Sequence, residues 1–189
     1  SYYGLGEIKF RGTHDTRAMG DLNIVGDSIH LNLMNPASYS NLRTTTLAIG
    51  GTSNFNRLSS SSDDEKAQRT TLDYLAIGFP IGKFGVSFGL TPFSAVGYQN
   101  QKITTQSNNI YNGEGNINSV FIGGSYKLTK SLSIGLDFSY KFGDITTETI
   151  EFLRNPDILF GSRERNTSNI KGSTFTSGLL YNTKINKKI

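Results

Sequence analysis

The chain has 189 residues, of which 35% are hydrophobic, and it contains 21 glycines, 12 phenylalanines, 9 tyrosines, two histidines and no cysteine. This length favours a single domain, and no stretch approaches the roughly 20 consecutive apolar residues of a transmembrane helix. The net charge of +4 comes from basic residues scattered over turns and strand ends, so no basic patch indicates nucleic-acid binding. Two histidines without cysteine do not provide the ligand set of a dedicated zinc site, and we expect neither a metal nor a cofactor.

The first 43 residues lack an alternating pattern, carry both histidines (His14 and His30), and end near the turn sequence Asn35-Pro36-Ala37. We predict that residues 1–43 form a plug and that residues 44–189 form the first part of a β-barrel. The apolar side chains of the first segment would otherwise stay exposed, and irregular backbone at membrane depth needs protein or water around it. Asn35, Pro36 and Ala37 are candidate gating residues, since proline fixes φ and asparagine can satisfy backbone groups of a turn. The alternative for these three residues is a static turn.

Six segments follow in which apolar and polar residues alternate, as in β-strands with one apolar face. They cover residues 44–56, 71–79, 84–92, 116–128, 132–142 and 173–185. In the clearest of them, Ile134, Leu136 and Phe138 alternate with residues such as Ser133 and Asp137. Its length fits the roughly 9–11 residues of a tilted strand in a bilayer. We therefore predict that the apolar set faces lipid and that Ser133 and Asp137 face inward.

The connections between these strands alternate in length, with tight turns at 80–83 and 129–131 and long polar links at 57–70, 93–115 and 143–172. Outer-membrane barrels alternate short periplasmic turns with long external loops. The predicted fold class is therefore all-β, an antiparallel up-and-down transmembrane β-barrel in the bacterial outer membrane, in contact with membrane lipids. A single-chain barrel needs at least about eight strands. We therefore expect an incomplete barrel with 44–56 and 173–185 as its edges, the remainder lying beyond Ile189 or in another chain.

Three short motifs add a resemblance to a known family. Tyr3-Gly4-Leu5-Gly6-Glu7, Ala18-Met19-Gly20 and Asn35-Pro36-Ala37-Ser38-Tyr39, together with Leu132-Ser133-Ile134-Gly135-Leu136 after a Thr-Lys turn, resemble Bacteroidota members of the FadL/TodX-type family of outer-membrane channels. The resemblance implies a barrel of fourteen strands, of which about six are present, behind an N-terminal hatch. It implies a transport function, in which hydrophobic small molecules such as long-chain fatty acids or hydrocarbons pass the plug. The alternative function is a structural or docking subunit of an outer-membrane secretion or surface-protein complex.

Catalytic chemistry is not indicated, and we expect that the protein is not an enzyme. His14 lies next to Asp15 and serines are abundant, but no Gly-x-Ser-x-Gly elbow positions a nucleophile. Asp63-Asp64-Glu65 lacks the spaced pattern of an EF-hand loop, so a solvated loop tip is the interpretation we prefer. The partners expected are therefore membrane lipids and hydrophobic small molecules or, under the alternative, other subunits of an outer-membrane complex.

Overall fold

A computed structural model describes residues 4–20, 22, 27–59, 64–105, 107–153 and 161–183. The N-terminal part holds strand β1 (Glu7–Ile8), helix α1 (His14–Ala18) and the 3₁₀ helix η1 (Pro36–Asn41). The long strands are β2 (Thr46–Ser59), β3 (Asp64–Ile81), β4 (Phe84–Ile103), β5 (Ser107–Lys127), β6 (Leu132–Leu153) and β7 (Ser162–Tyr181). Of the predicted elements, residues 184–185 of the last strand and Asp63 of the acidic link lie outside the described residues, as does Ile189.

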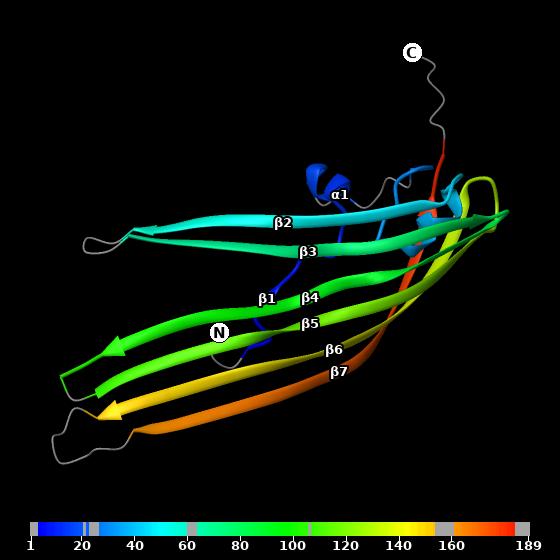
Figure 1. The fold of residues 1–189 in the computed structure, drawn as a ribbon. Coiled ribbons are helices and arrows are strands. Elements are labelled where there is room, and N and C mark those ends of the chain that lie inside the picture. The colour runs from blue at the N-terminus through cyan, green and yellow to red at the C-terminus, as the bar shows by residue number, and fades with distance from the viewer. Residues whose placement is uncertain are drawn as a thin grey trace. The chain divides into compact units, whose positions relative to one another are not determined.

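The long strands form one sheet in the order β2-β3-β4-β5-β6-β7, in which neighbours in the chain are neighbours in space (Figure 1). The registered pairs are antiparallel, for example Leu47 with Ile77 between β2 and β3, and Ile77 with Phe88 between β3 and β4. The prediction of an all-β, antiparallel, up-and-down sheet is therefore confirmed. The outer strands of the path are β2 and β7, which contain most of the two predicted edges.

The described part of the structure shows the antiparallel sheet, but it does not show a closed barrel or the plug that the sequence predicted. Among the described residues β2 and β7 have no registered pairing with each other, so closure of the sheet is not shown. No plug is evident in the described part of the chain. Instead, a segment between Phe10 and Leu42 packs against the sheet. The predicted boundary at residue 43 stays a prediction.

Most of the predicted long links are strand rather than loop. β4 and β5 together absorb most of the link 93–115, and β6 and β7 absorb most of the link 143–172. The prediction was wrong because it ended each strand where its apolar residues ended. A backbone ladder needs paired N–H and C=O groups, which polar residues supply equally well. The link 57–70 likewise belongs to β2 and β3 wherever it is described.

Contacts divide the chain into two compact units, and the long strands β4 to β7 run through both of them. The first unit comprises residues 1–9, 92–119 and 140–173. Its apolar cluster is Val96, Ile117 and Ile145, with Phe93, Tyr98 and Ile170 packed against it. In this unit β1 pairs antiparallel with β4, Glu7 opposite Ala95 and Ile8 opposite Ser94.

The second unit comprises residues 10–91, 120–139 and 174–189. Its buried cluster joins the N-terminal segment to strands β3 and β5, and its members are Leu31, Leu33, Tyr39, Leu42, Tyr74, Ala76 and Phe121. Four of these seven residues come from the N-terminal segment. That segment is therefore part of the hydrophobic core of the unit.

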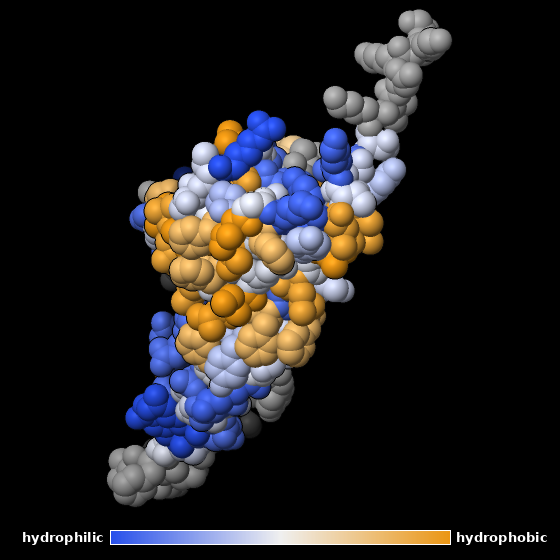
Figure 2. Space-filling view, turned by 90° about the vertical axis from the view of Figure 1, so that its right-hand side faces the viewer, coloured by the Kyte–Doolittle hydropathy of each residue, from blue (hydrophilic) through white to orange (hydrophobic). Residues whose placement is uncertain are grey.

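In the second unit, buried and exposed side chains alternate along β6 as the sequence predicted, while the contact of the exposed face with lipid stays a prediction. Ser133 is 4% exposed and Asp137 is fully buried, whereas Leu136 is 54% exposed between Ile134 and Phe138. Apolar residues of the other strands in this unit are also exposed, namely Leu47, Ile49, Leu75, Phe84, Phe88, Val120, Ile122, Phe175 and Leu179. Figure 2 shows hydrophobic side chains gathered in one area of the surface, with hydrophilic residues on either side of it. Of the helices in the described residues, none combines the length and the apolar character needed to cross a membrane.

Candidate functional site

The turn that leads into η1 is fixed by its own polar groups. Asn35 is the N-cap of η1, and its Oδ1 accepts a hydrogen bond from the Ala37 backbone N at 3.1 Å. Pro36 occupies the first turn, where its missing N–H costs nothing. The Ser38 hydroxyl donates to the Asn35 carbonyl at 2.7 Å, and Asn32 Oδ1 accepts from the Met34 backbone N at 2.9 Å. The structure thus brings Asn35, Pro36 and Ala37 together at the start of one short helix. Their gating role stays a prediction.

Glycines of the sheet form a seat for this helix. A Cβ on Gly85 of β4 would lie closer than 3.0 Å to the Tyr39 backbone, and one on Gly135 of β6 would lie as close to the Pro36 and Ala37 backbone. A Cβ on Gly178 of β7 would meet the Asn35 side chain. Real Cβ atoms essentially never approach other atoms so closely, so only glycine lets η1 come this near. We call these three glycines the glycine seat.

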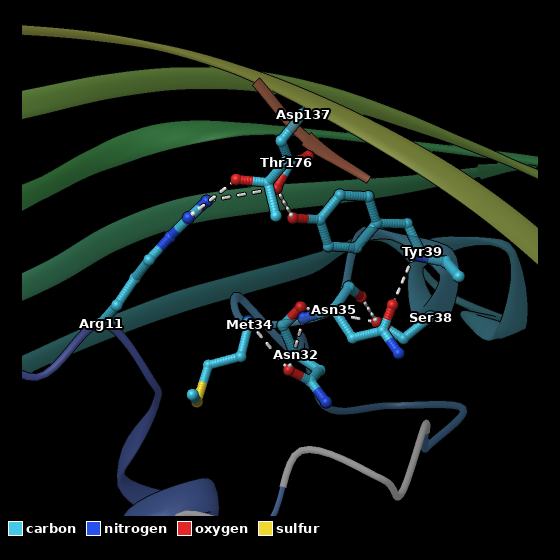
Figure 3. A network of polar contacts seen from close by, with 9 residues as sticks. Arg11, Asn32, Met34, Asn35, Ser38, Tyr39, Asp137 and Thr176 are labelled. Atoms are coloured by element: carbon cyan, nitrogen blue, oxygen red, sulfur yellow. Dashed lines mark hydrogen bonds and ion pairs between the residues drawn. The ribbon is translucent and has the colours of Figure 1, made fainter. Parts of the chain in front are cut away.

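The buried carboxylate of Asp137, two residues from Gly135 on β6, binds the N-terminal segment. The Asp137 side chain is fully buried, and its Oδ2 accepts a hydrogen bond from the Tyr39 hydroxyl at 3.1 Å (Figure 3). Arg11 forms an ion pair with the same oxygen at 3.4 Å and donates to the Thr176 hydroxyl of β7 at 3.2 Å. A buried charge is costly unless it is paired and hydrogen-bonded. Since both partners of Asp137 come from the N-terminal segment, the carboxylate and the segment depend on each other.

A second set of polar contacts attaches α1 to the β2–β3 pair. Arg17 and His14 each place a side-chain nitrogen 3.8 Å from Asp73 Oδ2 on β3, and the His14 backbone N donates to the Tyr74 hydroxyl at 3.2 Å. Thr52 of β2 also donates to Asp73. The carboxylate near the His14 side chain is therefore Asp73. The sequence did not indicate this contact, because it showed only that Asp15 is adjacent to His14. In the part of the chain that is described, no group of three or more acidic, histidine or cysteine residues could hold a metal ion.

We expect Tyr39→Phe to lower the free energy of unfolding of the protein by about 1–2 kcal/mol. The change keeps the ring and removes the one hydroxyl that donates to buried Asp137. Chemical denaturation in micelles measures the loss, with Tyr140→Phe on β6 as the control, because the Tyr140 side chain is more exposed than Tyr39. If the two changes cost the same, the hydroxyl contributes nothing specific at Asp137.

The loop before the buried cluster carries a titratable pair. The His30 ring donates a hydrogen bond to the Asp27 carboxylate, which raises the pKa of His30 above its usual 6.5 and lowers the pKa of Asp27. The pair therefore stabilises the folded state most fully between the usual aspartate pKa of 3.8 and the usual histidine pKa of 6.5. This contribution is lost as the pH rises through the raised pKa of His30 or falls through the lowered pKa of Asp27. An NMR titration should show the raised pKa of His30, and Asp27→Asn should return it toward about 6.5. An unchanged value in the variant would contradict this assignment.

A scan against known families matches the family described as BamG over residues 1–189, the whole sequence. No curated protein and no solved structure gives a significant match. The resemblance to the FadL/TodX-type family is therefore wrong, because the matching family is a different one. The hydrophobic-compound channel and its transport role are wrong for the same reason, and the count of fourteen strands loses its basis. The motifs behind the resemblance were short, and Asn-Pro-Ala alone is a turn signal found in unrelated chains.

Proposed function

The chain belongs to the BamG family, and from that membership we propose that it is a subunit of the machinery that assembles outer-membrane proteins. The match over residues 1–189 is the observation that carries this proposal, because the family name suggests that machinery. The function is of the kind expected as the alternative from sequence, a docking or structural subunit of an outer-membrane complex. Its partners would be the other subunits of that complex.

The exposed apolar face of the second unit supports a position in the bacterial outer membrane. Residues such as Leu47, Ile122, Leu136 and Leu179 are half or more exposed, on four different strands. Soluble proteins rarely expose large contiguous apolar patches, whereas lipid-facing strands require them. We propose that this face contacts lipid and that the sheet is part of a transmembrane barrel.

The outer strands β2 and β7 support a barrel with further strands. An unpaired strand edge in hydrocarbon leaves N–H and C=O groups unsatisfied, each at a cost of several kcal/mol. Further strands pairing with β2 and β7 would remove this cost. The N-terminal segment, which covers the polar face of β6, would then fill the interior, with Asn35, Pro36 and Ala37 seated on the sheet.

Co-purification and depletion together test the assembly function. A tagged copy is extracted from outer membranes in mild detergent, and its complexes are separated by native electrophoresis and identified by mass spectrometry. We expect stable association with the outer-membrane assembly machinery, and depletion should lower the amounts of folded outer-membrane barrel proteins. The proposal fails if the protein migrates alone and its depletion leaves these barrel proteins unchanged.

A further inference from the structure

A small cavity lies in the N-terminal segment of the second unit, between α1 and the residues that follow Asp27. Its volume is about 280 Å³, and it is lined by Thr13, Asp15, Thr16, Met19, Asp27, His30, Leu31 and Asn32. None of these residues belongs to a β-strand, so the cavity is a feature of the N-terminal segment itself. Two residues of the lining also hold the segment in place: Asn32 fixes the turn before η1, and Leu31 belongs to the buried cluster with β3 and β5.

The surface that this cavity offers to a ligand is mainly apolar. Thr13, Thr16, Leu31 and Asn32 are its buried members, and Met19 is 46% exposed. The two threonine hydroxyls hydrogen-bond to each other at 3.0 Å, and Asn32 Oδ1 already accepts from two backbone nitrogens. Met19 and Leu31 are the apolar side chains of the lining, and of these two Met19 is the exposed one. Methionine adapts its shape readily to an inserted group.

The size of the cavity suits a single side chain. Its volume lies at the small end of the range for pockets that hold drug-sized molecules, roughly 300–1,000 Å³. A single leucine or phenylalanine side chain fits a cavity of this size. Anchoring one apolar side chain in such a cavity is a common way for protein partners to recognise each other.

The charge around the cavity is acidic although the whole chain carries a net charge of +4. Asp15 and Asp27 are the carboxylates of the lining, and His30 shares Asp27. The cation on α1, Arg17, is engaged elsewhere, since it lies near Asp73 and over the Phe10 ring. A ligand that complements this site therefore carries positive charge next to its apolar group.

We propose that this cavity is the docking site for an apolar side chain flanked by lysine or arginine, in an extended segment of a partner subunit. The inference rests on the proposed function only for the identity of the partner as a subunit. The geometry and the charge of the site do not depend on it. Ile29, next to His30 in the sequence, is also half exposed.

The two methionines of the chain allow a direct test. Met19 lines the cavity and Met34 does not, so ¹³C-methyl labelling of methionine gives one reporter and one internal control. The purified full chain in micelles is titrated with the peptide Gly-Ser-Lys-Phe-Lys-Ser-Gly and, separately, with Gly-Ser-Glu-Phe-Glu-Ser-Gly. We expect a saturable shift of the Met19 signal with the first peptide, an unmoved Met34 signal, and at least about fivefold weaker binding of the second peptide.

Charge reversal at the cavity provides the matched variant. Asp15→Lys should weaken binding of the lysine peptide by at least about fivefold and strengthen binding of the glutamate peptide. Glu114→Lys in the first unit should change the affinity for neither peptide. Should Asp15→Lys fail to fold, Asp15→Asn removes the charge at nearly constant size and should weaken the lysine peptide by about two- to threefold.

Equal binding of both peptides, or no saturable shift at millimolar peptide, overturns the docking proposal. A shift of Met19 caused by the detergent alone does so as well, because the occupant would then be an acyl chain. The measurement uses the isolated protein, so a negative result here leaves the co-purification test of the assembly function unaffected.

Discussion

Gly135→Val should lower the free energy of unfolding by about 3 kcal/mol and release η1 from the sheet. Its Cβ would lie closer than 3.0 Å to backbone atoms of Pro36 and Ala37, and backbone cannot rotate aside as a side chain can. Overpacking of a fitted interior usually costs about 1–3 kcal/mol, and a contact with backbone belongs at the upper end of that range. Valine itself suits a β-strand, so the loss would report the contact with η1 rather than strand propensity.

Gly124→Val on β5 is the matched control, because a Cβ at Gly124 would meet nothing within 4 Å. Denaturant unfolding in micelles gives the stability of both variants, and limited proteolysis near Asp27 reports release of the segment. We expect faster cleavage in Gly135→Val and a native pattern in Gly124→Val. If both variants were native in stability and in cleavage, the close approach of η1 to β6 would be contradicted.

Leu136→Arg should cost about 2–4 kcal/mol in a reconstituted bilayer, the penalty for a charged side chain on the lipid face near mid-strand. On a water-exposed surface the same change would cost less than about 0.5 kcal/mol, because Leu136 is already 54% exposed and packs little against the protein. The size of the effect therefore distinguishes lipid from water as the neighbour of this face. Equilibrium unfolding from vesicles measures it.

Leu136→Ala separates the charge from the loss of apolar area. In the bilayer it should cost clearly less than Leu136→Arg, since it removes methyl groups without adding a charge. A cost for Leu136→Arg as small as that of the alanine variant would argue against a lipid-facing β6.

The faces of β6 could be predicted from sequence because alternation is a local property. In each strand of this region the alternation of apolar and polar residues identifies the apolar face, as with Leu136 and Asp137 in β6. The partners of Asp137 could not be predicted, since Arg11 and Tyr39 lie 126 and 98 positions away. A substitution at Asp137 would therefore disturb its contacts with Arg11 and Tyr39, and not only the inward face of β6. Both sites are sensitive, for different physical reasons.

The glycine seat shows a second limit of the sequence. Gly85, Gly135 and Gly178 stand on the polar side of their strands, where a small residue needs no special explanation. Only the approach of η1 shows why no other residue fits. Asn35, Pro36 and Ala37 were identified from their turn chemistry alone, and the structure places these three residues against Gly135 and Gly178. The full length of β4 to β7 was not predicted, because the parts of these strands within residues 93–115 and 143–172 are mainly polar.

The long sequence separations at the seat determine when it can form. Arg11 reaches Thr176 across 165 positions, and the Asn35 side chain reaches the Leu179 carbonyl across 144. Contacts so distant close large loops, and they form only after the intervening strands have paired. The N-terminal segment, which precedes these strands in the sequence, is therefore fixed only after β7 has joined the sheet. Until then, Leu33 and Tyr39, which are buried in the folded unit, remain accessible to a chaperone.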